Sequence, residues 1–137
     1  MISRSHRNVF IIRFDNGEEI IKSLQNFCHK NKISGGYFNG IGACKETTIS
    51  YFDIQQNKYI EKRIKENCEI VSISGFITTI GQKKHIHAHI SLANKKNKVI
   101  GGHLKETITS PTCEIFLVKT KNIKRKKDKK TGLMFIN

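Results

Sequence analysis

Residues 85–104 have the sequence HIHAHISLANKKNKVIGGHL, which contains four of the six histidines of the chain. From His85 to Ile90, histidine alternates with an apolar residue, which is the two-residue period of a β-strand with one buried face. Residues 94–98, NKKNK, form a polar turn, and apolar residues return at Val99. The stretch predicts a β-hairpin with its imidazoles on one face and its apolar side chains toward the core.

The register of this hairpin brings a third histidine to the pair His87 and His89. If the turn is symmetric about Lys96, His89 lies opposite His103, and opposite residues share a face of the sheet. Three neutral imidazoles suit Zn²⁺, with a fourth position open to water or substrate, and Fe and Ni accept the same ligand type. We predict a divalent metal, zinc first, on His87, His89 and His103, with His85 too far along the strand to be a ligand.

Acidic residues and glycines near the hairpin extend this hypothesis. An alternating histidine pair alone is also typical of an exposed polar strand that binds nothing. Glu69 and Glu114 are candidates to orient a ligating histidine or to act as an acid or base, because each lies in an apolar strand where an unpaired charge is costly. Side-chain alternation equally allows both carboxylates to face solvent. Gly101 and Gly102 leave room for an ion, a ligand or another backbone.

The chain of 137 residues is long enough for one domain with a real core. Its patterns predict the α+β class, with a mostly antiparallel β-sheet and one main amphipathic helix. The helix is expected over residues 17–31, capped by Asp15 or Asn16. About eight strands are expected, at residues 6–14, 47–52, 59–64, 68–80 and 112–120 and in the histidine hairpin, and residues 107–111 are expected to be a connector.

The chain is strongly basic, with a net charge of +14. Residues 119–130 hold eight basic residues and one acid, Asp128, so this segment carries +7 and the remaining 125 residues carry the other +7. Such a segment favours contact with nucleic-acid phosphates without reading the sequence, although the composition is rich in lysine throughout. The residues expected to contact duplex DNA are Lys124, Arg125, Lys126, Lys127, Lys129 and Lys130.

The cysteines and the apolar runs indicate in which cellular compartment the protein is expected. Cys28, Cys44, Cys68 and Cys113 lie in apolar segments without a C-x-x-C pair, so we interpret them as buried small hydrophobes in a reducing compartment. No apolar run approaches the length of a membrane span, and residues 9–12 are too few for a signal-peptide core. We expect a cytoplasmic protein with no membrane partner.

Several longer motifs occur in a characteristic order. They are GYFNGIGA from residue 36, SYFD from 50, CEIVSISGFITT from 68, HAHISL from 87, VIGGHL from 99 and TCEIFL from 112. This order resembles the PPC (plant and prokaryote conserved) domain over nearly the whole chain, 1–137. The resemblance implies an α+β fold around a β-sheet, a homotrimer and, in bacterial and archaeal members, a metal cluster near the trimer contacts at the positions of His87, His89 and His103.

The resemblance leaves more than one function open. Plant members join the domain to an AT-hook, which binds the DNA minor groove, and many prokaryotic members are described as candidate DNA-binding proteins on that basis. This chain has no Arg-Gly-Arg-Pro core, so the expectation is DNA association without strong sequence preference. The fold also resembles that of acetolactate decarboxylase, which holds zinc on a similar histidine set. The alternative is therefore a metal-dependent enzyme or small-ligand-binding trimer that uses the same three histidines.

Overall fold

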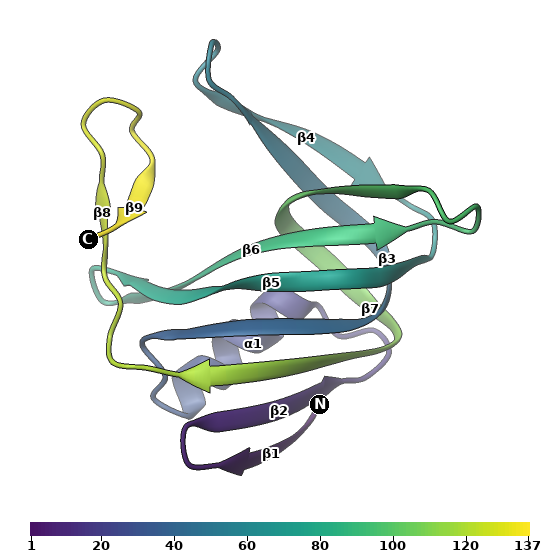
Figure 1. Ribbon diagram of the computed structural model, residues 1–137, viewed down its shortest axis with the longest axis horizontal. Coiled ribbons are helices and arrows are strands. Elements are labelled where there is room, and N and C mark those ends of the chain that lie inside the picture. The colour runs from purple at the N-terminus through teal and green to yellow at the C-terminus, as the bar shows by residue number, and fades with distance from the viewer.

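The chain folds into a mostly antiparallel β-sheet with one helix packed on one side, as a computed structural model of residues 1–137 shows (Figure 1). The elements in chain order are β1 (Ile2–His6), β2 (Val9–Phe14), α1 (Ile20–Lys30), β3 (Gly36–Asp53), β4 (Lys58–Ile64), β5 (Cys68–Ile80), β6 (Lys83–Ala93), β7 (Val99–Lys119), β8 (Arg125–Lys127) and β9 (Met134–Ile136). The predicted fold class is confirmed. No helix is both long and apolar enough to cross a membrane.

Seven strands form the main sheet in the order β1-β2-β7-β6-β5-β3-β4, with a further pairing between β7 and β3. The long strands β3 and β7 bend, so each pairs with different neighbours along its length. Because β3 pairs with both β5 and β7, and β6 joins β5 to β7, these four strands close a circuit. The remaining strands, β8 and β9, form a separate hairpin that stands beside one end of the sheet (Figure 1).

The helix covers only one side of the sheet. It buries Ile20, Leu24, Phe27 and Cys28 against the inward side chains of the strands, and each such apolar side chain contributes about 1.5–3 kcal/mol. All four cysteines are buried and free, as the apolar surroundings predict. The opposite side of the sheet, which we call the outer face, carries no helix (Figure 1).

The N-terminal region differs from the sequence prediction. The strand expected over residues 6–14 is a hairpin of β1 and β2 that turns at Arg7, whose φ is 53°. The helix begins at Ile20 instead of residue 17, because its cap is Glu19 and neither Asp15 nor Asn16. The Glu19 carboxylate accepts hydrogen bonds from the free N–H groups of Ile21 (3.0 Å) and Lys22 (2.6 Å). It also accepts one from the backbone of β7, at Thr107 (3.2 Å), and so ties the helix start to the sheet.

The predicted connector at residues 107–111 is wrong, since β7 runs unbroken from Val99 to Lys119. Pro111 has no N–H for a ladder hydrogen bond, and strands accept proline at bulges. Such an irregularity occurs here: the β3–β7 register shifts between Gly42, opposite Cys113, and Cys44, opposite Thr109. Pro111 therefore lies where the ladder is already interrupted.

The outer face combines exposed apolar side chains with the histidines of β6. Tyr37 lies opposite Phe76, and Phe76 lies opposite His87 on the next strand. The rings of Tyr37 and Phe76 meet edge to face with centroids 5.4 Å apart. Further exposed apolar residues on this face are Ile11, Ile41 and Phe116. The histidines are thus one border of an apolar surface that nothing in the chain covers.

Candidate metal centre

Three histidine side chains converge on the outer face. His87 and His89 come from β6, and His103 comes from β7 directly opposite His89, in the predicted register. The ring centroids of His87 and His103 are 5.0 Å apart, and each lies 5.4 Å from that of His89. One ring nitrogen from each residue lies within 4.8 Å of the other two. The predicted set of three is therefore brought together by the structure.

The cluster has a donor set that could hold a divalent cation such as Zn²⁺, with three imidazole nitrogens within 4.8 Å of one another. Tetrahedral sites with metal–nitrogen bonds of about 2.1 Å place the nitrogens about 3.4 Å apart, so the three rings would have to move closer together to bind one ion. A metal needs deprotonated ring nitrogens. Burial lowers the pKa of His87 to about 4, helped by the charge of Arg125. Burial also lowers the pKa of His103, with the nearby His89 as the next cause.

An arginine from the C-terminal hairpin holds the cluster on one side. Arg125 Nη2 lies 2.8 Å from His87 Nδ1. Its Nε donates to Thr78 Oγ1 at 3.1 Å, and its Nη1 donates to the carbonyl of Met134 at 2.6 Å. These contacts correct the sequence prediction for Arg125, which is a half-buried neighbour of the histidines and is not displayed for phosphate contact. Nothing in the run of basic residues distinguishes it from the lysines beside it.

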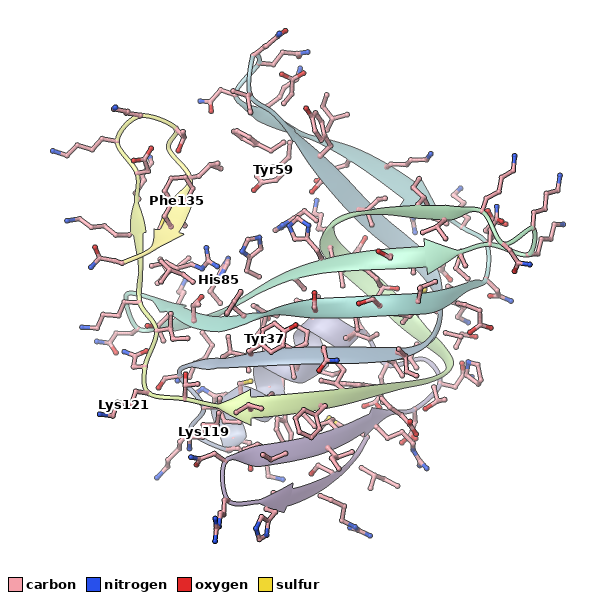
Figure 2. The ribbon with its side chains drawn as sticks, in the orientation of Figure 1. Tyr37, Tyr59, His85, Lys119, Lys121 and Phe135 are labelled. Carbon is pink, nitrogen blue, oxygen red and sulfur yellow. The ribbon has the colours of Figure 1, made fainter.

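The cluster opens into a cavity of about 400 Å³. Figure 2 shows Tyr59, Phe135 and His85 around the same space, with the arm of β3 and β4 on one side and the C-terminal hairpin on the other. The ring of Tyr59 has its centroid 5.3 Å from that of His103. His85 lines the cavity, close to Thr78 Oγ1 at 3.4 Å, but is not one of the three converging residues. Two separate chain segments thus wall the space above the histidines.

The structure does not bring the two predicted acidic partners to the cluster. Glu69 pairs with Ala93, four residues beyond His89 on β6, and Glu114 pairs with Arg13 on β2. Both side chains are exposed. Strand alternation puts them on the outer face with the histidines, but their partners are Ala93, Arg13 and Ile41 and not a histidine of the cluster. The contact to a histidine ring comes from Arg125 and not from a carboxylate.

The glycines beside the histidines serve the approach of other backbones. A Cβ at Gly101 would lie 2.6 Å from the carbonyl oxygen of Ile90, and one at Gly102 would lie 2.9 Å from that of Ser50. Of the three possibilities named for these glycines, close backbone contact is the one the structure shows.

The other residues predicted to contact DNA are lysines of the hairpin and of the residue before it. They are exposed without exception: Lys124, Lys126, Lys127, Lys129 and Lys130. Asp128 shapes the turn between them, since its Oδ2 accepts from the backbone of Lys130 (3.1 Å) and Thr131 (2.8 Å). The basic segment is not one surface, however. Lys119 and Lys121 lie toward the end of β7, away from the hairpin (Figure 2).

Comparison with known families matches residues 1–121 to the Plants and Prokaryotes Conserved (PCC, also PPC) domain. The chain belongs to this family. A PPC protein of Pyrococcus horikoshii is 33% identical, with a TM-score of 0.88 over 99% of this chain and 94% of its own. A protein of Bacteroides thetaiotaomicron, described as a candidate DNA-binding protein, is 28% identical, with a TM-score of 0.96 over 99% and 96%.

Two further comparisons concern the metal and the fold. A protein of Archaeoglobus fulgidus described as metal-containing is 27% identical, with a TM-score of 0.88 over 100% of this chain and 99% of its own. Acetolactate decarboxylase of Bacillus subtilis is 13% identical, with a TM-score of 0.59 over 82% of this chain and 52% of its own. That likeness concerns the fold alone, and it confirms the predicted relation. Among curated proteins, none matches this PPC chain.

The low pKa of His87 predicts how the metal-free PPC protein responds to acid. Its folded-state pKa of about 4 lies below the usual histidine value of 6.5, so the unfolded chain binds more protons between these two pH values. The stability from the neutral ring is fully present above about pH 6.5 and is lost as the pH falls toward 4. We expect the urea midpoint to drop between pH 7 and pH 5, and to drop less in His87→Asn.

The exposed residue His6 on β1 provides the control for this measurement. His6→Asn should keep the pH dependence of the wild type. An unchanged pH dependence in His87→Asn would contradict the assignment.

Proposed function

We propose that this PPC protein is a homotrimer that binds a divalent metal, zinc first, through His87, His89 and His103. The observation that carries this proposal is the convergence of three imidazole nitrogens within 4.8 Å on the β6–β7 hairpin. The depressed pKa of His87 and His103 supports it, because both rings offer a lone pair at neutral pH. The metal-containing relative from Archaeoglobus fulgidus supports it as well.

Metal uptake tests the first part of the proposal. Protein purified without chelator and then dialysed against Zn²⁺ should hold about one metal per chain by mass spectrometry of the elements. His103→Ala should weaken zinc affinity by at least about 100-fold, since loss of even an outer-shell partner costs 10–100-fold. His6→Ala, which removes an exposed imidazole from β1, should bind like the wild type. Absence of uptake, or equal affinity in His103→Ala, would refute the metal site.

The outer face supports the proposed self-association. Five apolar side chains are exposed on it: Ile11, Tyr37, Ile41, Phe76 and Phe116. Phe76 is the strand neighbour of His87, Tyr37 is the next along the same row, and the other three lie further across the sheet. Contiguous exposed apolar surface is typical of protein interfaces. A second copy of the chain is the occupant we propose, and the number three comes from the family resemblance.

Light scattering after size exclusion tests the trimer. The wild type should elute at three times the chain mass of 15.7 kDa. Phe116→Asp should lower the mass, because a charge in a buried apolar contact is costly. Ile54→Asp is the control, since Ile54 is exposed in the turn after β3 and lies off the outer face. A monomeric wild type would rule out the assembly.

DNA association is a second candidate function, supported by the five exposed lysines from Lys124 to Lys130. Four of them lie on the β8–β9 hairpin, whose turn is held by hydrogen bonds to Asp128, and Lys124 directly precedes it, so the five basic groups are close in the chain. Such a surface contacts phosphates and carries no sequence information. A trimer would present three copies and gain avidity from them. The relative from Bacteroides thetaiotaomicron, described as a candidate DNA-binding protein, is consistent with this.

A salt series with labelled duplex DNA tests this candidate. Changing Lys124, Lys126, Lys127, Lys129 and Lys130 to Gln should weaken binding and reduce the slope of log K against log salt. Each lost phosphate contact should reduce the slope by about 0.9. The matched control changes five exposed lysines elsewhere, Lys58, Lys62, Lys65, Lys95 and Lys98. No binding at low salt, or equal losses in the two variants, would exclude a DNA-binding role for the hairpin.

A further inference from the structure

We propose that the cavity beside the metal centre binds a small organic carboxylate and that Arg125 anchors its carboxylate group. The inference rests on the proposed metal site and names the ligand that this site takes. The first observation behind it is that the positive charge of Arg125 has no acidic partner in the protein. Arg125 is half-buried, yet none of the five ion pairs of the chain includes it. A partly desolvated cation without a counter-charge is costly.

The surroundings of Arg125 are also without a fixed anion. The side chains that line the cavity with it include His85, His87, His103 and Tyr59, and none of the lining residues is acidic. The guanidinium lowers the pKa of all three of these histidines, although burial is the larger cause for each. The cavity is therefore electropositive before any metal enters, and a bound divalent cation adds two further charges.

Arg125 keeps hydrogen-bond donors free for a ligand. A guanidinium has five N–H groups, and three are used, by Thr78, by the Met134 carbonyl and by His87. One N–H on each terminal nitrogen is left. Arginine binds carboxylates through such pairs of donors, with geometry and charge both favourable.

Metal binding by His87 would release a third donor. Arginine can only donate, so His87 Nδ1 is the acceptor in their 2.8 Å contact and holds the single lone pair of the neutral ring. If Nδ1 binds the metal, Arg125 loses its acceptor. If Nε2 binds the metal, Nδ1 carries the proton and again cannot accept. Loading the site therefore frees Arg125 from His87 at the same step that raises the positive charge of the cavity.

The remaining walls select an organic ligand over a bare inorganic ion. Leu133, Met134 and Phe135 of the C-terminal hairpin form the apolar side of the cavity, and the Tyr59 ring lies opposite Phe135 (Figure 2). A volume of about 400 Å³ admits a molecule of small-metabolite size. A carboxylate at Arg125 with a short apolar body against these side chains satisfies both parts of the lining.

The probes for this inference are butyrate and butyramide, which share a shape and differ in charge, together with inorganic phosphate. Isothermal titration calorimetry on the zinc-loaded wild type should detect binding of butyrate and no binding of butyramide. Arg125→Gln should weaken butyrate about tenfold or more, the usual loss for a hydrogen bond to a charged group. Arg125→Lys keeps the positive charge but lacks the paired N–H donors of the guanidinium, so its affinity for butyrate should lie between those of the wild type and Arg125→Gln. The control Lys126→Gln removes a neighbouring exposed charge and should bind like the wild type.

Zinc content measured on the same samples separates the two proposals. If the protein carries zinc and butyrate does not bind, or binds equally to Arg125→Gln, the carboxylate site is wrong and the metal site stands. Phosphate binding without butyrate binding would also overturn the ligand class. If the protein takes up no zinc, the metal proposal fails, and Arg125-dependent binding of butyrate to the metal-free chain still decides this inference.

Discussion

The antiparallel register between β6 and β7 is the constraint on which the site depends. It sets His89 opposite His103, and a slip of one residue would turn one partner to the opposite face. The turn fixes this register locally, because Asn94 Oδ1 accepts from the backbone N–H groups of Lys96 (3.0 Å) and Lys98 (3.1 Å). The core fixes it globally, since the apolar residues between the histidines are buried on the helix side. The register of this one hairpin therefore determines both which apolar side chains are buried in the core and which histidines meet on the outer face.

The outer face is exposed because the only helix packs against the opposite side of the sheet. With α1 covering the inward side alone, all side chains of the other parity must meet solvent, another chain or a ligand. His89 is the exposed member of the cluster, whereas His87 and His103 are half-buried. In the proposed trimer, a neighbouring copy that covers Tyr37 and Phe76 would also approach these rings, because Phe76 is the strand neighbour of His87. Assembly and metal binding would then share a surface.

Local patterns predicted those parts of the structure that short-range physics decides. The two-residue alternation and the symmetric turn were enough for the hairpin register and for the three histidines. The α+β class follows in the same way from periodicity. The helix start was missed because Glu19 takes part in a contact with Thr107, which is 88 residues away. Pro111 looked like a strand end, because the bulge that accommodates it arises from the pairing of β7 with β3.

The position of Arg125 beside the histidines is the part of the site that the sequence did not predict. It is separated from His87 by 38 residues and lies in a run of lysines, so composition favours a uniform basic surface. Only the placement of the C-terminal hairpin separates it from that surface. The hairpin is joined to the end of β5, where Thr79 donates to the Ile123 carbonyl at 2.8 Å, and Arg125 then falls on the side that faces the histidines. Glu69 and Glu114 share the outer face with the histidines but lie at other places in the sheet, Glu69 opposite Ala93 and Glu114 opposite Ile41.

The partner of His87 reverses the usual polarity around a metal site. Ligating histidines ordinarily donate their second ring N–H to a carboxylate or carbonyl, which fixes the ring and adds negative charge. Here the ring faces a donor, so the protein supplies positive charge where an acceptor is usual. A metal on three neutral imidazoles beside an unpaired guanidinium would leave a net charge of about +3 with no acidic residue in the cavity lining. Partial burial prevents water from screening that charge fully. In the proposed metal-bound state, an anionic ligand would complete the electrostatic balance of this centre, because the cavity lining has no acidic residue to do so.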